Sequence, residues 1–259
     1  MLRWVIQSNL GHNDDVATLV AALDALGVAH EPLKVIPFDD TPPAVSTDGA
    51  VLFYGSTTLM KNVAAAGRWR PGVFFDAARF AFEALRAGYG DALLNAESEL
   101  VTIGAFVNRD LDPDTEVFLR PADDLKSFSG AVYTFGELAR WREALPQSRG
   151  PLQPDTVVQV ATPQTLGREW RCVVVEGRVI TASQYRSSGR ARMRPEVPDA
   201  VIAYANSMAA RYAPARVFML DVCETEAGLR VVETNCFNSA GFYCCDLYEV
   251  ARTVSALAF

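Results

Sequence analysis

Several common signatures are missing from this 259-residue sequence, and each absence excludes a class of protein. There is no G-x-x-x-x-G-K-[ST] phosphate loop, no G-x-G-x-x-G after an expected strand, and no G-x-S-x-G nucleophile elbow. The protein kinase signature set is absent as well. With only two histidines, a histidine-rich metal site is excluded, and nothing positions a histidine-based catalytic triad. A histidine-based triad is not excluded, but carboxylates, amides and cations form the stronger patterns.

Features of membrane and secreted proteins are also scarce. No run of 18 apolar residues occurs, so no membrane span and no membrane partner are expected. Polar residues interrupt the N-terminal stretch too early for the apolar centre of a signal peptide. The five cysteines are odd in number and two are adjacent, which suits neither a disulfide framework nor a zinc finger. We expect a cytoplasmic protein with free thiols, either small buried side chains or, at Cys244 and Cys245, a redox-active pair.

The composition is that of a folded, acidic protein. Half of the residues are hydrophobic, which is enough for a sizeable core, and the length suits about two domains. The net charge of −7 disfavours non-specific nucleic-acid binding, so no nucleic-acid partner is expected. The 24 lysines and arginines still leave room for a local basic cleft.

The order of expected elements indicates a mixed α/β (α+β) protein. A β-α-β opening predicts a small α/β unit, and a segment rich in proline and glycine near residue 150 precedes a strand-rich region. A Glu-Gly turn at residues 176–177 predicts a β-hairpin. Strands are expected at 2–7, 33–38, 50–54, 99–103, 116–119 and from 156 onward, and helices at 15–26, 76–87, 199–212 and after 247.

The segment 220–243 has the strongest chemical pattern. Asp221 lies within an apolar strand, Gly228 marks a turn, and Glu233 and Asn235 share one face of the returning strand. Acids inside apolar strands are costly without a partner. Two carboxylates and an amide oxygen form the oxygen-only set that Mg²⁺ prefers. The pattern favours a magnesium site over an exposed hairpin with solvated acids.

A second segment, 117–130, places Arg120 at the end of an apolar strand and Lys126 six residues later. Phosphates can bridge two such cations, because arginine binds them as a fork and lysine as a point charge. The alternative is a surface loop in which Asp123 and Asp124 neutralise Lys126.

A third segment, 167–186, has Glu169 and Arg171 on one strand face and Arg186 at the end of the returning strand. The acid could accept hydrogen bonds from sugar hydroxyls and the arginines could neutralise phosphates, or all three could form cross-strand ion pairs on a solvated face. Upstream, the extended stretch around Gln159 and Val160 could present backbone groups to an adenine edge.

Taken in order, these motifs resemble the ATP-grasp superfamily. F-x-R-P…K-S-F-x-G followed by E-W-R and V-E-x-N is similar to the divergent clade named for its Arg and Lys signature, over residues 95–250. That clade includes a eukaryotic cell-division-cycle protein that assists assembly of a translation initiation factor. The resemblance implies a pre-ATP-grasp α/β unit at 1–95 and an ATP-grasp domain at 96–259, with ATP between two lobes.

The resemblance also implies roles for the residues above and ATP with Mg²⁺ as cofactors. Phosphate contacts would come from Arg120 and Lys126, the adenine pocket from Gln159 and Val160, the ribose contact from Glu169, phosphate or substrate contacts from Arg171 and Arg186, and Mg²⁺ ligands from Asp221, Glu233 and Asn235. The implied activity is an ATP-dependent carboxylate–amine ligase that acts through an acyl phosphate on a small molecule, a peptide or a protein. Alternatives are an ATP-binding assembly factor without ligase turnover and phosphotransfer to a non-carboxylate acceptor.

Overall fold

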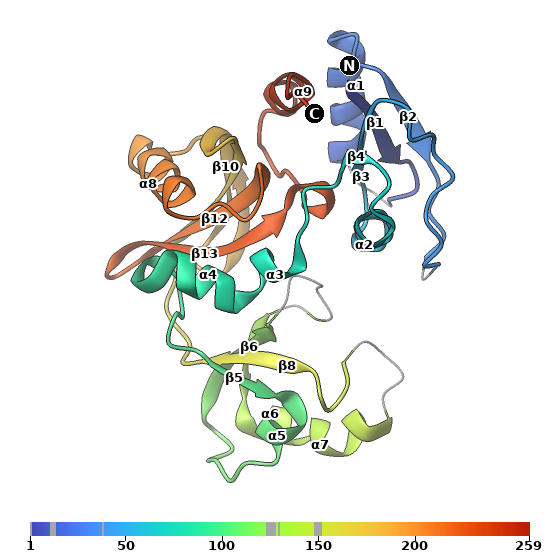
Figure 1. Cartoon of the computed structure of the whole chain (residues 1–259). Helices are drawn as coiled ribbons and strands as arrows, with labels where there is room; N and C mark the ends of the chain where they lie inside the picture. Colours follow the sequence, from blue (N-terminus) through green and yellow to red (C-terminus); the bar gives the residue numbers. More distant parts are fainter. Residues whose placement is uncertain (1, 11–13, 38, 123–127, 129, 148–151) are drawn as a thin grey trace.

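The computed structural model describes residues 2–10, 14–37, 39–122, 128, 130–147 and 152–259. It has three β-sheets, each with its own helices (Figure 1). The mixed α/β class expected from the sequence is confirmed. Within the described ranges, no helix is both long enough and apolar enough to cross a bilayer.

The N-terminal sheet is parallel, with the strand order β2-β1-β3-β4. Its elements are β1 (Leu2–Gln7), α1 (Asp14–Ala25), β2 (His30–Leu33), β3 (Ala50–Tyr54), α2 (Thr57–Ala66) and β4 (Arg70–Gly72). The strand expected at 33–38 is wrong, because β2 ends at Leu33. Leu33 pairs with Gln7, the last residue of β1, so β1 offers no further partner.

The helix expected at 76–87 is two helices, α3 (Ala77–Phe80) and α4 (Phe82–Tyr89), followed by the 3-10 turn η1 (Gly90–Ala92). Ala81 has extended backbone angles, and the Phe82 N–H donates to the carbonyl of Ala122 at 3.2 Å. Both helices pack against the C-terminal sheet. The domain boundary at residue 95 stays a prediction.

The middle sheet is antiparallel, with the order β5-β8-β6-β7. Its elements are β5 (Glu99–Thr102), α5 (Ile103–Val107), β6 (Glu116–Pro121), β7 (Ala131–Thr134), α6 (Phe135–Ala139), α7 (Trp141–Ala144), η2 (Leu145–Gln147) and β8 (Val157–Ala161). A separate apolar core that includes Ile103, Phe106, Leu119 and Leu138 holds its helices to the strands.

The C-terminal sheet is antiparallel, with the order β11-β10-β9-β12-β13. Its elements are β9 (Arg168–Val175), β10 (Arg178–Ser187), β11 (Arg190–Arg194), α8 (Asp199–Arg211), β12 (Val217–Thr225), β13 (Gly228–Cys236), η3 (Phe237–Ser239) and α9 (Leu247–Ser255). The expected hairpin at 176–177 is confirmed: Glu176 and Gly177 both have positive φ, as a tight two-residue turn requires.

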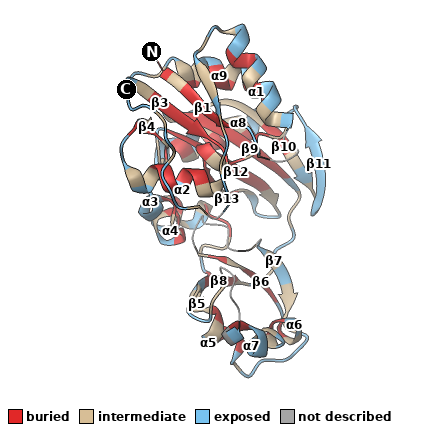
Figure 2. Ribbon diagram, turned by 90° about the vertical axis from the view of Figure 1, so that its right-hand side faces the viewer, coloured by how far each residue is buried: buried red, intermediate tan, exposed pale blue. Residues whose placement is uncertain are grey.

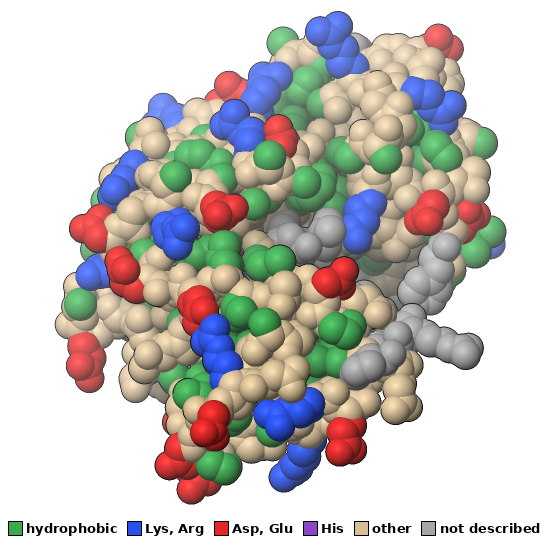
Figure 3. Space-filling view, turned by 60° about the horizontal axis from the view of Figure 1, so that its bottom comes forward, with side chains coloured by type: hydrophobic (Ala, Val, Ile, Leu, Met, Phe, Trp, Pro, Cys, Tyr) green, Lys and Arg blue, Asp and Glu red, His purple; other side chains and the backbone are tan. Residues whose placement is uncertain are grey.

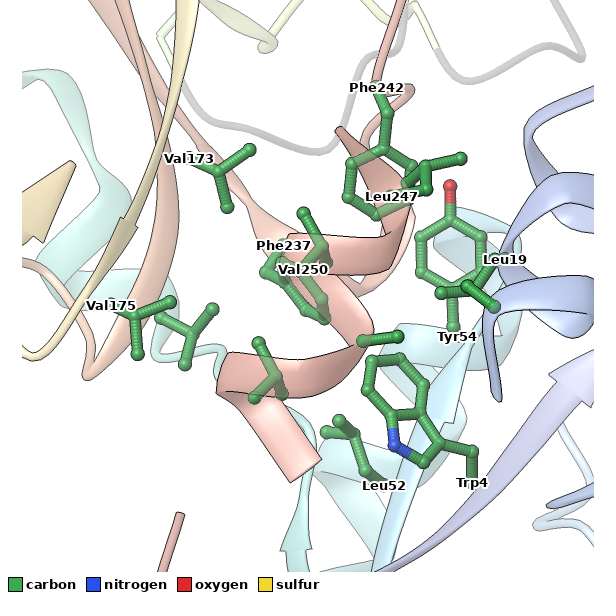
Figure 4. Packing of buried hydrophobic residues seen from close by; sticks show 14 of the residues in the cluster. Trp4, Leu19, Leu52, Tyr54, Val173, Val175, Phe237, Phe242, Leu247 and Val250 are labelled. Atoms are coloured by element: carbon green, nitrogen blue, oxygen red, sulfur yellow. The ribbon is translucent and has the colours of Figure 1, made fainter. Parts of the chain in front are cut away.

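Both faces of this sheet are covered, which explains the long apolar runs in its strands (Figure 2). Trp170, Cys172 and Phe218 face α4 and α8. Val173 and Met219, on the other face, pack in a core with α9 and the N-terminal unit. Figure 4 shows Val173 in this core. No disulfide joins the five cysteines, all of which belong to the described residues, and four of them are buried, as expected for small core side chains.

Candidate active site

Neighbouring strands of the C-terminal sheet change from apolar to polar at the same level. On the face that packs against α9, the apolar Val173 of β9 is followed, toward the start of that strand, by the charged Arg171. On the same face of β12, the apolar Met219 is followed by the charged Asp221. Asp221 is the register partner of Arg171 on one side and of Glu233 on the other. The pairing of Asp221 with the strand of Glu233 and Asn235, expected from the sequence, is confirmed. One sheet face thus continues from a core into a charged site.

Arg171 and Asp221 form a buried two-point ion pair. The Nε of Arg171 donates to Oδ1 of Asp221 at 2.9 Å and its Nη2 to Oδ2 at 2.7 Å, and both side chains are almost fully buried. Nη1 of Arg171 donates to the carbonyl of Gly241 at 2.9 Å. Burial alone would lower the pKa of Arg171, but the charge and hydrogen bonds of Asp221 raise it. The guanidinium therefore stays charged and holds both Asp221 and the 241–243 loop.

Glu233 connects two of the sheets. Its Oε2 accepts a charge-assisted bond from Nη2 of Arg120, on β6 of the middle sheet, at 2.6 Å. Its Oε1 accepts from Nδ2 of Asn235 at 2.9 Å, and the same amide lies 3.4 Å from Oδ2 of Asp221. Side chains predicted to bind phosphate and metal are therefore in direct contact with one another.

Glu169 is buried and has two partners on β10. The hydroxyl of Tyr185 donates to its Oε2 at 2.9 Å, and Nη1 of Arg186 lies 3.9 Å from Oε1. Burial raises the pKa of Glu169, although the Tyr185 hydrogen bond and the Arg186 charge oppose the rise. The Tyr185 ring stacks on Tyr243 with centroids 4.9 Å apart, and Tyr243 has a φ of 56°. Arg171 lies over Tyr243, with its Cζ 4.8 Å from the ring centre.

These groups line a cavity of about 840 Å³ between the middle and C-terminal sheets. Such a volume suits a nucleotide-sized ligand. The cavity also has apolar walls, which include Leu94 and Leu166 beside the links between the sheets, Phe118 and Val132 on the middle sheet, and Val232 on β13.

Seven of the residues singled out from the sequence line this cavity: Arg120, Glu169, Arg171, Arg186, Asp221, Glu233 and Asn235. Gln159 and Val160 are not among its lining residues. Gln159 is buried, donates to Oγ of Ser98 at 2.9 Å and borders a much smaller cavity, and Val160 packs in the core of the middle sheet. Lys126 lies outside the described residues.

Sequence reasoning missed several lining residues. Gln164 and Leu166 belong to the stretch between β8 and β9, and Nε2 of Gln164 donates to Oδ1 of Asn95 at 2.9 Å. The signal was available, since this stretch links two expected strands of different lobes. Tyr185 and Tyr243 had no such signal, because their stacking depends on a loop conformation and on sheet pairing.

Known structures with the same fold were found at low sequence identity. The D-cycloserine synthetase DcsG matches with a TM-score of 0.66 and 13% identity, over 98% of this chain and 99% of that one. The ATP-grasp ligase PsnB, in complex with a minimal precursor, matches with a TM-score of 0.60 and 17% identity, over 98% of both chains. The D-alanine–D-alanine ligase from Bacillus anthracis matches with a TM-score of 0.60 and 12% identity, over 98% of this chain and 92% of that one. These likenesses show a common fold.

A comparison with curated proteins finds no match. A family model described as an ATP-grasp domain, family 3 of the clade named for its Arg and Lys signature, matches residues 83–255, which is more than half of the chain. The match includes every cavity-lining residue that the sequence singled out. The resemblance drawn from the sequence is confirmed, and the chain belongs to the ATP-grasp superfamily, in family 3 of that Arg and Lys clade.

Proposed function

We propose that this protein binds Mg-ATP in the large cavity and is an ATP-dependent carboxylate–amine ligase. The observation that carries the proposal is the meeting of Arg120, from the middle sheet, with Glu233, Asn235 and Asp221, from the C-terminal sheet, at a nucleotide-sized cavity. ATP-grasp membership supports the nucleotide, and the ligase neighbours support the reaction class.

The nucleotide would lie between the two sheets. Its base suits the part of the cavity lined by Leu94, Leu166 and Val232, with the side-chain amide of Gln164 nearby. Arg120 would contact the phosphates, joined by Lys126, which follows β6 in sequence. The predicted adenine role of Gln159 and Val160 would require a backbone or indirect contact, because both side chains are buried in the middle sheet.

The donor set fits magnesium. Mg²⁺ usually takes one or two protein carboxylates and completes its shell with water and substrate phosphates. In the part of the chain that the structure describes, no three His, Cys, Asp or Glu side chains form a metal-binding group by themselves. Glu233 and Asn235 would hold the ion together with phosphate oxygens. Asp221 would share its oxygens with Arg171, whose bonds fix the position of the carboxylate.

Bound Mg²⁺ would neutralise charge on the transferring phosphoryl group. The chain's own residues would orient the reactants. Arg120 would exchange its bond with Glu233 for the phosphates. Arg186, whose side chain is half exposed, would reach substrate or phosphate, and Glu169 would accept from the ribose. Arg171 would act mainly through Asp221 and the 241–243 loop, and Tyr243 would form a wall beside the acceptor.

The proposed reaction needs no covalent protein nucleophile. A substrate carboxylate oxygen attacks the γ-phosphorus, which forms an acyl phosphate and releases ADP. An amine then attacks the acyl carbon, phosphate leaves, the amine loses a proton, and an amide bond forms. PsnB was solved with a minimal precursor, Mg and ADP, and with a precursor peptide, which supports a peptide among the acceptors to test.

The test is ADP release from Mg-ATP with pools of carboxylate, amine and hydroxyl acceptors, with the carboxylate and amine pools supplied alone and in combination and the hydroxyl pool supplied alone. We expect ADP to form with the carboxylate and an amide product to need both. Glu233→Gln, which keeps the side-chain volume and removes the charge, should lose turnover and stay folded. ADP formation with a hydroxyl acceptor would indicate phosphotransfer. Tight ATP binding without turnover in any pool would indicate an assembly factor, and either result would overturn the ligase assignment.

A further inference from the structure

One strand of the C-terminal sheet has no part in the core. β11 (Arg190–Arg194) is at the sheet edge and pairs only with β10, and all five of its residues are exposed (Figure 2). Even its one large apolar side chain, Met193, has 56% of its surface exposed. The side chains of this strand are therefore not needed for packing.

Three of these five residues are arginines at alternate positions: Arg190, Arg192 and Arg194. Among the described residues, no carboxylate lies within ion-pair distance of any of them, whereas Arg168, Arg216 and Arg252 each pair with a glutamate. Elsewhere, as on the face in Figure 3, acidic and basic side chains are interspersed. In a chain with a net charge of −7, this strand is a concentration of the opposite sign.

The strand begins at the rim of the large cavity. Ser188 and Gly189, the turn between β10 and β11, line that cavity, and so does Arg186, the register partner of Ala191. A chain-like ligand bound along β11 would therefore extend, beyond the start of the strand, to the mouth of the cavity.

We propose that β11 is a docking strand for an acidic, extended segment of a polypeptide acceptor. This proposal rests on the proposed ligase function. Alternate residues of an extended peptide are about 7 Å apart, which matches the spacing of alternate arginines on a strand. Arginine forms strong charge-assisted bonds with carboxylates. A short peptide with an acid at every second position therefore complements β11, while the negative net charge of the rest of the chain opposes a long nucleic acid.

The test is fluorescence anisotropy with a labelled peptide of alternating glutamate and serine, titrated with the full chain in the absence of nucleotide. The variant is Arg190→Gln, Arg192→Gln and Arg194→Gln together. The matched control is Lys34→Gln, Lys61→Gln and Arg140→Gln, which removes the same charge from exposed positions elsewhere in the chain. We expect the variant to bind roughly tenfold more weakly than wild type, the control to bind like wild type, and added salt to weaken binding.

Three results would overturn the proposal: no binding of the acidic peptide to wild type, an equal loss in the control, or equally tight binding of an oligothymidylate of the same charge. The variant should keep the Mg-ATP thermal shift of wild type, and a loss of that shift would place β11 in the nucleotide site instead. If wild type binds the peptide but not Mg-ATP, the nucleotide proposal fails while the docking strand stands.

Discussion

The two walls of the large cavity use charge in different ways. On the C-terminal sheet, buried charged groups are held by polar partners on the same sheet: Arg171 and Asp221 form an ion pair, and Glu169 accepts a hydrogen bond from the hydroxyl of Tyr185. On the middle sheet, Arg120 is the one charged residue among the described lining residues, and its neighbours there include Phe118 and Val132. One wall is preorganised by its own ion pairs, and the other provides apolar surface and a cation that reaches across the cavity.

This difference predicts which ion pairs contribute most to the free energy of unfolding. A buried ion pair that loses one partner leaves an uncompensated charge, whereas a partly exposed pair contributes little. The bond between Arg120 and Glu233 is of the second kind, because each side chain keeps about a quarter of its surface exposed (23% and 24%).

The largest effect should come from Asp221→Ala. We expect the free energy of unfolding to fall by about 3–5 kcal/mol, because Arg171 would remain buried without its counter-charge. Glu233→Ala is the control on the neighbouring strand and should cost about 1 kcal/mol or less. Urea unfolding of both variants without nucleotide measures this. Equal losses in the two variants would contradict the distinction between the walls.

A smaller effect, on ligand binding alone, is expected for Lys126→Ala. This lysine lies in sequence between β6 and β7 and outside the described residues, and its phosphate role stays a prediction. Loss of a charge-assisted contact should weaken ATP binding by roughly 1.5–3 kcal/mol, or about ten- to a hundredfold. Lys126→Arg should rescue binding only in part, because a planar fork does not reproduce a point charge. Unchanged ATP affinity with a small stability loss would indicate a solvated loop charge instead.

The smallest effect concerns the pH dependence of stability. The pKa of Glu169 is raised by burial, so its contribution to stability is present at low pH and is lost as pH rises through the folded-state pKa. Glu169→Gln should therefore gain stability relative to wild type between about pH 4 and about pH 7.

Glu224→Gln is the matched control with the opposite sign. The hydrogen bond from Arg168 lowers the pKa of Glu224, so the contribution of this carboxylate is present above its unfolded-state pKa and is lost as pH falls through the folded-state pKa. Relative to wild type, the variant should therefore lose stability as pH rises toward about 4.3 and show no further change above about pH 5. Urea unfolding at several pH values checks both slopes. If the free energies of unfolding of the two variants, each relative to wild type, changed with pH in the same direction, the raised pKa assigned to Glu169 would be contradicted.

The sequence allowed the hairpin of β12 and β13 to be predicted, because the turn at Gly228 and the alternation of Glu233 and Asn235 are local signals. It did not reveal the Arg171–Asp221 pair, which depends on β9 lying between β10 and β12. Gln159 could not be placed, because an extended apolar stretch does not say which cavity a buried polar side chain borders. The interruption at Ala81 depends on a contact with Ala122, which is distant in sequence.

The most direct test of the central claim, that both walls together hold Mg-ATP, is calorimetric titration of ATP with Mg²⁺ into wild type and Glu233→Gln. We predict saturable binding to wild type, a raised melting temperature in the presence of the ligand, and clearly weaker binding to the variant at unchanged stability without ligand. Absence of both heat and thermal shift in folded wild type at millimolar Mg-ATP, or equal affinity in the variant, would contradict it.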